Sequence, residues 1–273
     1  MLAISGTLAT ADAPQADAYP PRFGYANHLR TGTVAVSSEQ GDFPREFATD
    51  SFTETAWLGV EGEGSWWIAV AAPGARADFC GLLLFGDNPR NAPEGLTVTL
   101  QYSDDGGSTW ENVSDPVMPI DRVLVFLFDA QMHDHWRVFF EAIDPPRVAD
   151  VTLGEALRAE RGVQAPFQPP RQARNNRILN NETNQGHFVG RSIIRRGIET
   201  EISLSLVREA WVRNQWEPLL DHAELRPLYL VWSPVHWPDE AAFVWSRGAI
   251  PKPRYTNAAG FMEVSLPVKG IAR

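Results

Sequence analysis

Apolar and polar residues alternate over many short segments of this chain, and turn-forming residues separate the segments. A period of two is typical of β-strands, because successive side chains point to opposite faces of a sheet. In the first 158 residues the pattern predicts strands at 31–39, 66–70, 79–85, 97–103, 110–113, 123–128 and 136–140. Short strands joined by polar turns predict an antiparallel β-sandwich.

Two of these strands, 79–85 and 123–128, are apolar throughout instead of alternating. Such a continuous run predicts a buried strand, and it is far too short to cross a bilayer. We therefore expect no membrane insertion. Between the two runs, the segment from Asp104 to Gly107 predicts a hairpin turn, because glycine readily adopts a positive φ.

The pattern changes after residue 158. Residues 159–181 contain three prolines and show no period, which predicts a linker. The alternation that follows predicts strands at 198–206, 228–233, 241–246 and 261–268.

Residues 208–225 are helical in composition. The apolar residues at helical spacing are Val212, Trp216, Leu219 and Ala223. Because proline cannot donate a backbone hydrogen bond, Pro218 predicts a kink or two helical pieces within this segment.

We therefore divide the chain into an arm (1–29), a β-sandwich (30–158), a linker (159–181) and a second β domain that carries one helix (182–273). The predicted fold class is all-β, with a second sandwich or sheet joined to the first. Phe23 is one of two aromatic residues expected to anchor the arm.

Charge distinguishes the two halves. Residues 1–160 contain 24 acidic and nine basic side chains, and residues 161–273 contain ten and 15, which gives net charges of −15 and +5. An acidic domain repels nucleic-acid phosphates, so we expect no nucleic-acid partner. No basic residue precedes Arg22, so the charged start of a signal peptide is missing and synthesis in the cytoplasm is predicted.

Four blocks of the first half resemble the discoidin family, whose members are galactose-binding-like β-sandwiches. The blocks are the loop from Asp50 to Trp57, the strand Trp66–Val70, TVTLQYSDDGGSTWENV at 97–113, and HWRVFFEA with ADVTLGEAL at 135–142 and 149–157. The resemblance covers roughly residues 30–158. It implies a sandwich that binds carbohydrate through the loops at one end.

The second half is similar to the belt domain of distal-tail and related tail-tip proteins of siphophages. The segments that carry this similarity are GHFVGRSIIRRG (186–197), ISLSLVREAWVRNQWEPLLDHAEL (202–225), LYLVWSPVHWPDEAAFVW (228–245) and GFMEVSLPVKGI (260–271). The similarity implies a homo-oligomeric ring, other tail or baseplate proteins as partners, and a place in the virion after synthesis in the host cytoplasm.

Sugars are bound by planar amide and guanidinium groups and by aromatic faces. In the loops 40–46 and 86–95, the residues with these groups are Phe43, Arg45, Asn88, Arg90 and Asn91. We expect them to contact a host surface glycan. The alternative is that they are solvated loop residues.

The discoidin resemblance also implies a structural calcium ion near Asp50, with Asp150 as a second carboxylate. Calcium takes six to eight oxygen ligands, most of which would be backbone carbonyls here. The alternative is that Asp50 caps a turn. No other cofactor is predicted.

The second domain is rich in arginine and tryptophan, which are enriched at protein interfaces. The expected interface residues are Arg191, Arg195, Arg196, Trp211, Trp216 and Trp237. For the arginines, a solvated strand edge is the alternative.

No Ser-His-Asp spacing, glycine-rich phosphate loop or metal-binding helix motif is present, so we predict no enzyme. The sequence favours a structural protein of a phage tail tip or baseplate that presents a carbohydrate-binding module for host attachment. Two alternatives stay open, a stand-alone lectin or adhesin and, less favoured, a polysaccharide-degrading enzyme.

Overall fold

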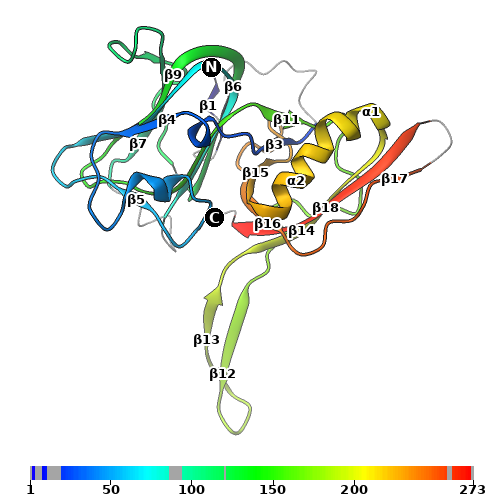
Figure 1. The fold of residues 1–273 in the computed structure, drawn as a ribbon. Helices are drawn as coiled ribbons and strands as arrows, with labels where there is room; N and C mark the ends of the chain where they lie inside the picture. The colour runs from blue at the N-terminus through cyan, green and yellow to red at the C-terminus, as the bar shows by residue number, and fades with distance from the viewer. Residues whose placement is uncertain are drawn as a thin grey trace.

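The computed structural model describes residues 2–3, 8–10, 20–85, 94–119, 121–256 and 260–271, with side chains from residue 20 onward. These residues form a nine-stranded, a seven-stranded and a two-stranded sheet, together with one interrupted helix (Figure 1). The predicted all-β fold class is confirmed. No helix in the described ranges is long and apolar enough to span a membrane.

The first sheet forms the sandwich. Its strands are β1 (Leu2–Ala3), β2 (Leu8–Thr10), β4 (Thr33–Val36), β5 (Trp57–Leu58), β6 (Ser65–Leu84), β7 (Thr97–Ser103), β8 (Glu111–Asn112), β9 (Val123–Glu141) and β10 (Arg147–Gly154). Short 3₁₀ helices η2 (His28–Arg30) and η3 (Arg45–Ala48) lie in its loops. The hairpin predicted at 104–107 is confirmed between β7 and β8.

The two longest strands run through both layers of this sandwich. β6 pairs with β4 near its start and with β10 near its end, and β9 pairs with β6 along most of its length. The register between them shifts from Ala71 to Ala75 and again from Ala77 to Phe79. Such bulges bend strands, so the same pair contributes to both layers. The sequence predicted each half as a separate strand.

At the end of β6 (79–84) and the start of β9 (123–128), both faces are buried. Cys80 and Phe126 point into the sandwich core, whereas their neighbours Phe79 and Val125 belong to a cluster on the outer face. This arrangement explains why these two strands are apolar throughout, since a strand with one face in water alternates.

The second sheet has the order β11-β3-β15-β16-β18-β14, and β17 pairs with β18. Its strands are β3 (Arg22–Gly24), β11 (Ala156–Arg158), β14 (Ile198–Arg208), β15 (Leu228–Val231), β16 (Ala241–Ser246), β17 (Arg254–Tyr255) and β18 (Phe261–Ile271). β3 comes from the predicted arm, where Phe23 is fully buried and contacts Trp216 edge to face at 5.5 Å.

The helix covers one face of this second sheet (Figure 1). It consists of α1 (Glu209–Trp211), a π-helical turn (Val212–Trp216) and α2 (Glu217–Leu225), with Pro218 in the first turn of α2. The interruption immediately precedes the proline, which cannot donate to the carbonyl one turn earlier. The backbone stays helical throughout, so the structure has a π-helical turn where the sequence predicted a kink or two helical pieces.

The opposite face of the second sheet packs on the outer face of the sandwich. Tyr229 and Phe243 join Phe79 in one buried cluster, with ring centroids 5.7 Å apart for Phe79 and Tyr229 and 4.9 Å apart for Tyr229 and Phe243. The two domains therefore share a core.

The sandwich is inserted into the second sheet between two adjacent strands. The short strands β1 and β2 of the sandwich sheet come before β3 in the chain, and the rest of the sandwich lies between β3 and β11. β3 and β11 pair with each other through Gly24 and Ala156, so the chain enters and leaves this main part of the sandwich at the same place. Residues 22–24 belong to the second sheet, although the sequence pattern assigned them to an arm.

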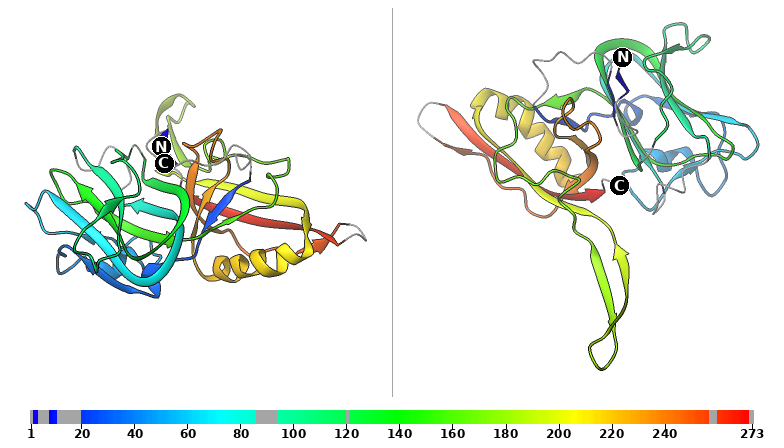
Figure 2. Two further views of the ribbon diagram at one scale, coloured as in Figure 1. Left: turned by 90° about the horizontal axis from the view of Figure 1, so that it is seen from above. Right: turned by 180° about the vertical axis from the view of Figure 1, so that it is seen from behind.

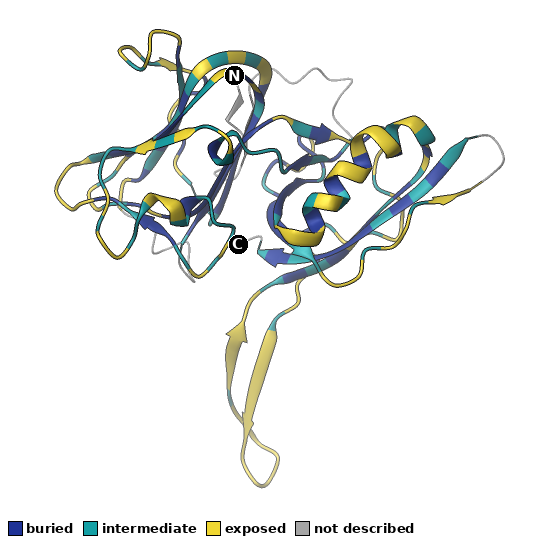
Figure 3. Ribbon diagram, in the orientation of Figure 1, coloured by how far each residue is buried: buried dark blue, intermediate teal, exposed yellow. Residues whose placement is uncertain are grey.

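A two-stranded hairpin projects away from both domains (Figures 1 and 2). It consists of β12 (Arg177–Glu182) and β13 (Phe188–Arg195). Nearly all of its surface is exposed (Figure 3). The predicted linker, 159–181, includes all of the first strand of this hairpin except Glu182. The rest of that linker is tied to the second sheet, for example by the hydrogen bond from the Gln164 amide to the Ser203 carbonyl.

Replacing Gly24 by alanine tests the close approach of the two domains. A Cβ atom at this position would lie 2.1 Å from the Phe79 ring, which the shared core holds in place. We expect Gly24→Ala to lower the free energy of unfolding by about 1–3 kcal/mol in urea denaturation. Gly41→Ala is the control, because nothing lies within 4 Å of its added Cβ. Equal stability of the two variants would contradict this packing.

Candidate functional site

A guanidinium group fixes the aromatic residues at the loop end of the sandwich. Arg147 lies over the rings of Phe43 and Phe85, with its Cζ atom 5.1 Å and 4.6 Å from the two centroids. Arg147 is exposed, and a cation–π contact at an exposed site contributes about 0.5–1 kcal/mol. Phe43, predicted to contact glycan, thus stacks with Arg147 and Phe85.

The other residues predicted for glycan binding lie apart from this stack or are not described. The Arg45 amide donates to Glu39 at 2.9 Å, and its guanidinium pairs with Glu46 at 3.3 Å. Its side chain is nearly half exposed. The remaining predicted residues lie outside the described part of the chain, namely Asn88, Arg90 and Asn91.

Asp50 stabilises its own loop. One carboxylate oxygen accepts from the Phe52 amide and the other accepts from the Thr55 hydroxyl, both at 2.8 Å. This is the turn-capping role that the sequence left open as the alternative.

Asp150 is buried where the two domains meet. Its Oδ2 atom accepts hydrogen bonds from the Tyr229 hydroxyl and the Thr152 hydroxyl, both at 3.0 Å, while its Oδ1 atom has no hydrogen-bond partner. Burial raises the pKa of this carboxyl to about 6, and the hydrogen bonds and the charge of Arg30 offset only part of that rise.

These side chains do not fit a calcium ion shared by Asp50 and Asp150. A positive charge is already present there, because the Arg30 guanidinium lies 4.0 Å from Asp150 and donates to Ser51 at 2.5 Å. The described residues include no group of three or more His, Cys, Asp or Glu side chains that could hold a metal ion. Calcium binding by backbone carbonyls of the Asp50 loop stays a prediction.

The six residues predicted at an interface differ in exposure. Trp237 is 52% exposed, and Arg191, Arg195 and Arg196 are exposed on the hairpin or at its base. Trp216 has no exposed surface, so its assignment to an interface is wrong. It fills the second core because the helix presents it at the spacing of the other apolar residues. Trp211 is half-buried against it.

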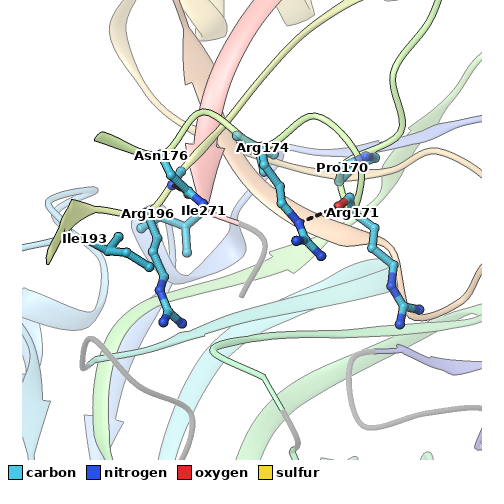
Figure 4. A pocket seen from close by; sticks show the side chains of 9 residues that line it. Pro170, Arg171, Arg174, Asn176, Ile193, Arg196 and Ile271 are labelled. Carbon is cyan, nitrogen blue, oxygen red and sulfur yellow. Dashed lines mark hydrogen bonds between the residues drawn. The ribbon is translucent and has the colours of Figure 1, made fainter. Parts of the chain in front are cut away.

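A basic cleft lies between the two domains, and the sequence did not predict it. Its volume is about 400 Å³, and its lining residues are Thr53, Glu54, Phe85, Arg122, Asn175, Arg195, Arg196, Gly197, Ile198, Trp245, Lys269, Gly270 and Ile271. A second cleft of about 290 Å³ at the base of the hairpin shares Arg196 and adds Arg171 and Arg174 (Figure 4). Several distant segments form these clefts, so no local motif could reveal them.

No protein-family model matches this sequence, and no curated protein matches it. Among solved structures, a chitosan-binding module of a Paenibacillus sp. IK-5 chitosanase/glucanase is 20% identical and covers 48% of this chain and 97% of its own, with a TM-score of 0.40. The module CpGH89CBM32-5 of Clostridium perfringens, in complex with GalNAc-β-1,3-galactose, is 14% identical. The match covers 47% of this chain and 99% of the module, with a TM-score of 0.41.

A Ruminococcus gnavus GH29 fucosidase is also similar over part of the chain, at 13% identity and a TM-score of 0.41. The match covers 48% of this chain and only 27% of the fucosidase. All three similarities thus extend over about half of this chain.

The raised pKa of Asp150 predicts how stability depends on pH. The folded protein binds the proton of the Asp150 carboxyl more tightly than the unfolded chain does. The stability that this protonation gives is present below pH 4 and is lost as the pH rises through about 6. The loss corresponds to about 3 kcal/mol.

The comparison of wild type with Asp150→Asn in urea at several pH values measures this effect, since the other titrating groups cancel in the difference. We expect the wild type to lose stability relative to the variant between pH 4 and pH 7. Parallel pH curves for the two proteins would contradict a buried, protonatable Asp150.

Proposed function

We propose that this protein is a non-enzymatic component of a phage tail tip or baseplate. Its second domain self-associates into a ring, and its sandwich projects from that ring to contact host glycan or a neighbouring tail protein. The similarity of the second half to tail-tip belt domains and of the first half to galactose-binding-like sandwiches motivates this proposal.

The projecting hairpin is the observation that carries the proposal. Its large apolar side chains are strongly exposed, between 44% for Ile178 and 66% for Val189. The members of this apolar set are Ile178, Leu179, Phe188, Val189, Ile193 and Ile194. A two-stranded hairpin alone is marginally stable in water, and its open edges invite pairing. These side chains therefore favour burial against a partner.

Charge supports a second copy of the chain as that partner. Outside the clefts described above, the hairpin carries two arginines, Arg177 and Arg191, and one glutamate, Glu182. The sandwich belongs to the half of the chain with a net charge of −15. Opposite charges steer association and fix its orientation. A contact between the hairpin of one copy and another part of the next is head-to-tail, which is the geometry that builds rings.

The shared core supports the role of a rigid carrier. Domains joined only by a linker move relative to each other, whereas a large apolar interface fixes them. Here Phe79, Tyr229 and Phe243 are buried together between the domains. Each sandwich would therefore project from the ring in one fixed direction.

The hairpin variant Phe188→Ser/Val189→Ser tests self-association. We expect the wild type to elute as a multiple of the 30.4 kDa chain in size-exclusion chromatography with light scattering, and the variant as a single chain. The control Met118→Ser/Met132→Ser removes two apolar side chains with similar exposure from the sandwich, and it should keep the wild-type mass. A wild type that stays monomeric at high concentration would refute the ring.

Immobilised galactose-containing glycans test the attachment role. Several linked sites raise apparent affinity by about 10²–10⁴ when they bind together. We expect the wild type to bind the surface far more tightly than the monomeric hairpin variant, while free sugar binds both equally. Tight binding by a monomeric wild type would favour a lectin, and no binding of any glycan would remove the attachment role.

A further inference from the structure

The basic cleft between the domains combines several cations with few anions. The cations that line it are Arg122, Arg195, Arg196 and Lys269, and Glu54 is the one carboxylate among its described lining residues. Arg171 and Arg174 follow in the adjoining cleft. Like charges gathered in a concave site repel one another and attract anions, because low-dielectric walls concentrate their field.

Two of these cations already have a carboxylate beside them. Asp239 pairs with Arg171 at 2.5 Å, and Glu199, which pairs with Arg247 at 2.5 Å, lies directly opposite Lys269. Among the residues that the structure describes, neither Arg195 nor Arg196 forms an ion pair. These two guanidinium groups are therefore the ones available to an incoming anion.

The backbone fixes where these arginines lie. Arg195 ends β13 and Arg196 follows it, in the tight connection to β14 that begins at Ile198. Figure 4 shows that the side chains of Arg171, Arg174 and Arg196 extend toward the same side, and that Arg174 donates to the Arg171 carbonyl. Planar guanidinium groups bind carboxylate or phosphate through two parallel hydrogen bonds.

Aromatic side chains form another part of the cleft wall. Trp245 and Lys269 are directly opposite each other on β16 and β18, so their side chains lie on the same face of the sheet. Phe85 and Trp245 pack against the shared core and also line the cleft. An aromatic face next to a cation suits a sugar ring that carries an acidic group. The volume of about 400 Å³ is within the range for small-ligand sites.

We propose that this cleft binds an anionic saccharide, with its carboxylate or phosphate held by Arg195 and Arg196 and a sugar ring against Trp245. The choice of a saccharide rests on the proposed attachment function. The site adjoins the stack that contains Phe43, because Phe85 belongs to both, but neither Phe43 nor Arg45 lines it and the second domain supplies three of its four cations.

Titration calorimetry of the full chain at low ionic strength tests this site. The probes are trigalacturonic acid, galactose 6-phosphate and uncharged galactotriose, so that the first two identify which acidic group is preferred. We expect at least one acidic probe to bind and the neutral trimer not to bind. The double variant Arg195→Ala/Arg196→Ala should bind the acidic probe about tenfold or more weakly, because it lacks the charge-assisted hydrogen bonds to the acidic group.

The matched control is Arg177→Ala/Arg191→Ala, which removes the same charge from the hairpin but none from either cleft. It should bind the acidic probe as the wild type does. Equal loss in both double variants, equal binding of the neutral trimer, or no binding of either acid would overturn the proposal.

Failure here is distinguishable from failure of the proposed function. Binding to the cleft is measured in solution with free sugars, whereas ring formation is measured by the mass of the assembly. An intact ring with glycan-array binding but no acid bound in the cleft would remove only this inference. A monomeric protein that binds trigalacturonic acid through Arg195 and Arg196 would remove the ring and keep the cleft.

Discussion

The need to bury both faces of one half of the sandwich determines how this molecule is built. The end of β6 and the start of β9 are apolar on both sides, so the sandwich core covers only one of their faces. The second sheet covers the other with Tyr229 and Phe243. Only a small residue fits at the places where an aromatic ring of this contact lies against the backbone. The contact also keeps the carboxyl group of Asp150 away from water.

The same contact sets the relative positions of the aromatic stack, the basic cleft and the hairpin. It holds the Phe43–Arg147–Phe85 stack next to the second domain and closes one wall of the basic cleft. The hairpin starts at the end of the second sheet that borders the cleft, and it projects from that end (Figure 2). Self-association through the hairpin would therefore repeat both the sandwich loops and the cleft at fixed positions around an assembly.

Periodicity predicted most strands, and the glycine and proline residues predicted the hairpin at Asp104–Gly107 and an irregularity in the helix near Pro218, because these depend on local residues. It could not show that β6 and β9 each pass through two layers, since a bulge has no clear apolar signal. Contacts between distant segments were also missed, among them the pairing of Arg22–Gly24 with the second sheet and the lining of the cleft. Trp216 was misassigned because composition does not distinguish a core tryptophan from one at an interface.

Differential scanning calorimetry of the full chain tests the shared core most directly. Domains that share a buried cluster should unfold together, in one transition whose calorimetric and van't Hoff enthalpies agree. If association complicates the transition, the monomeric hairpin variant gives the same test. Two separate transitions, one for the sandwich and one for the second domain, would contradict the account.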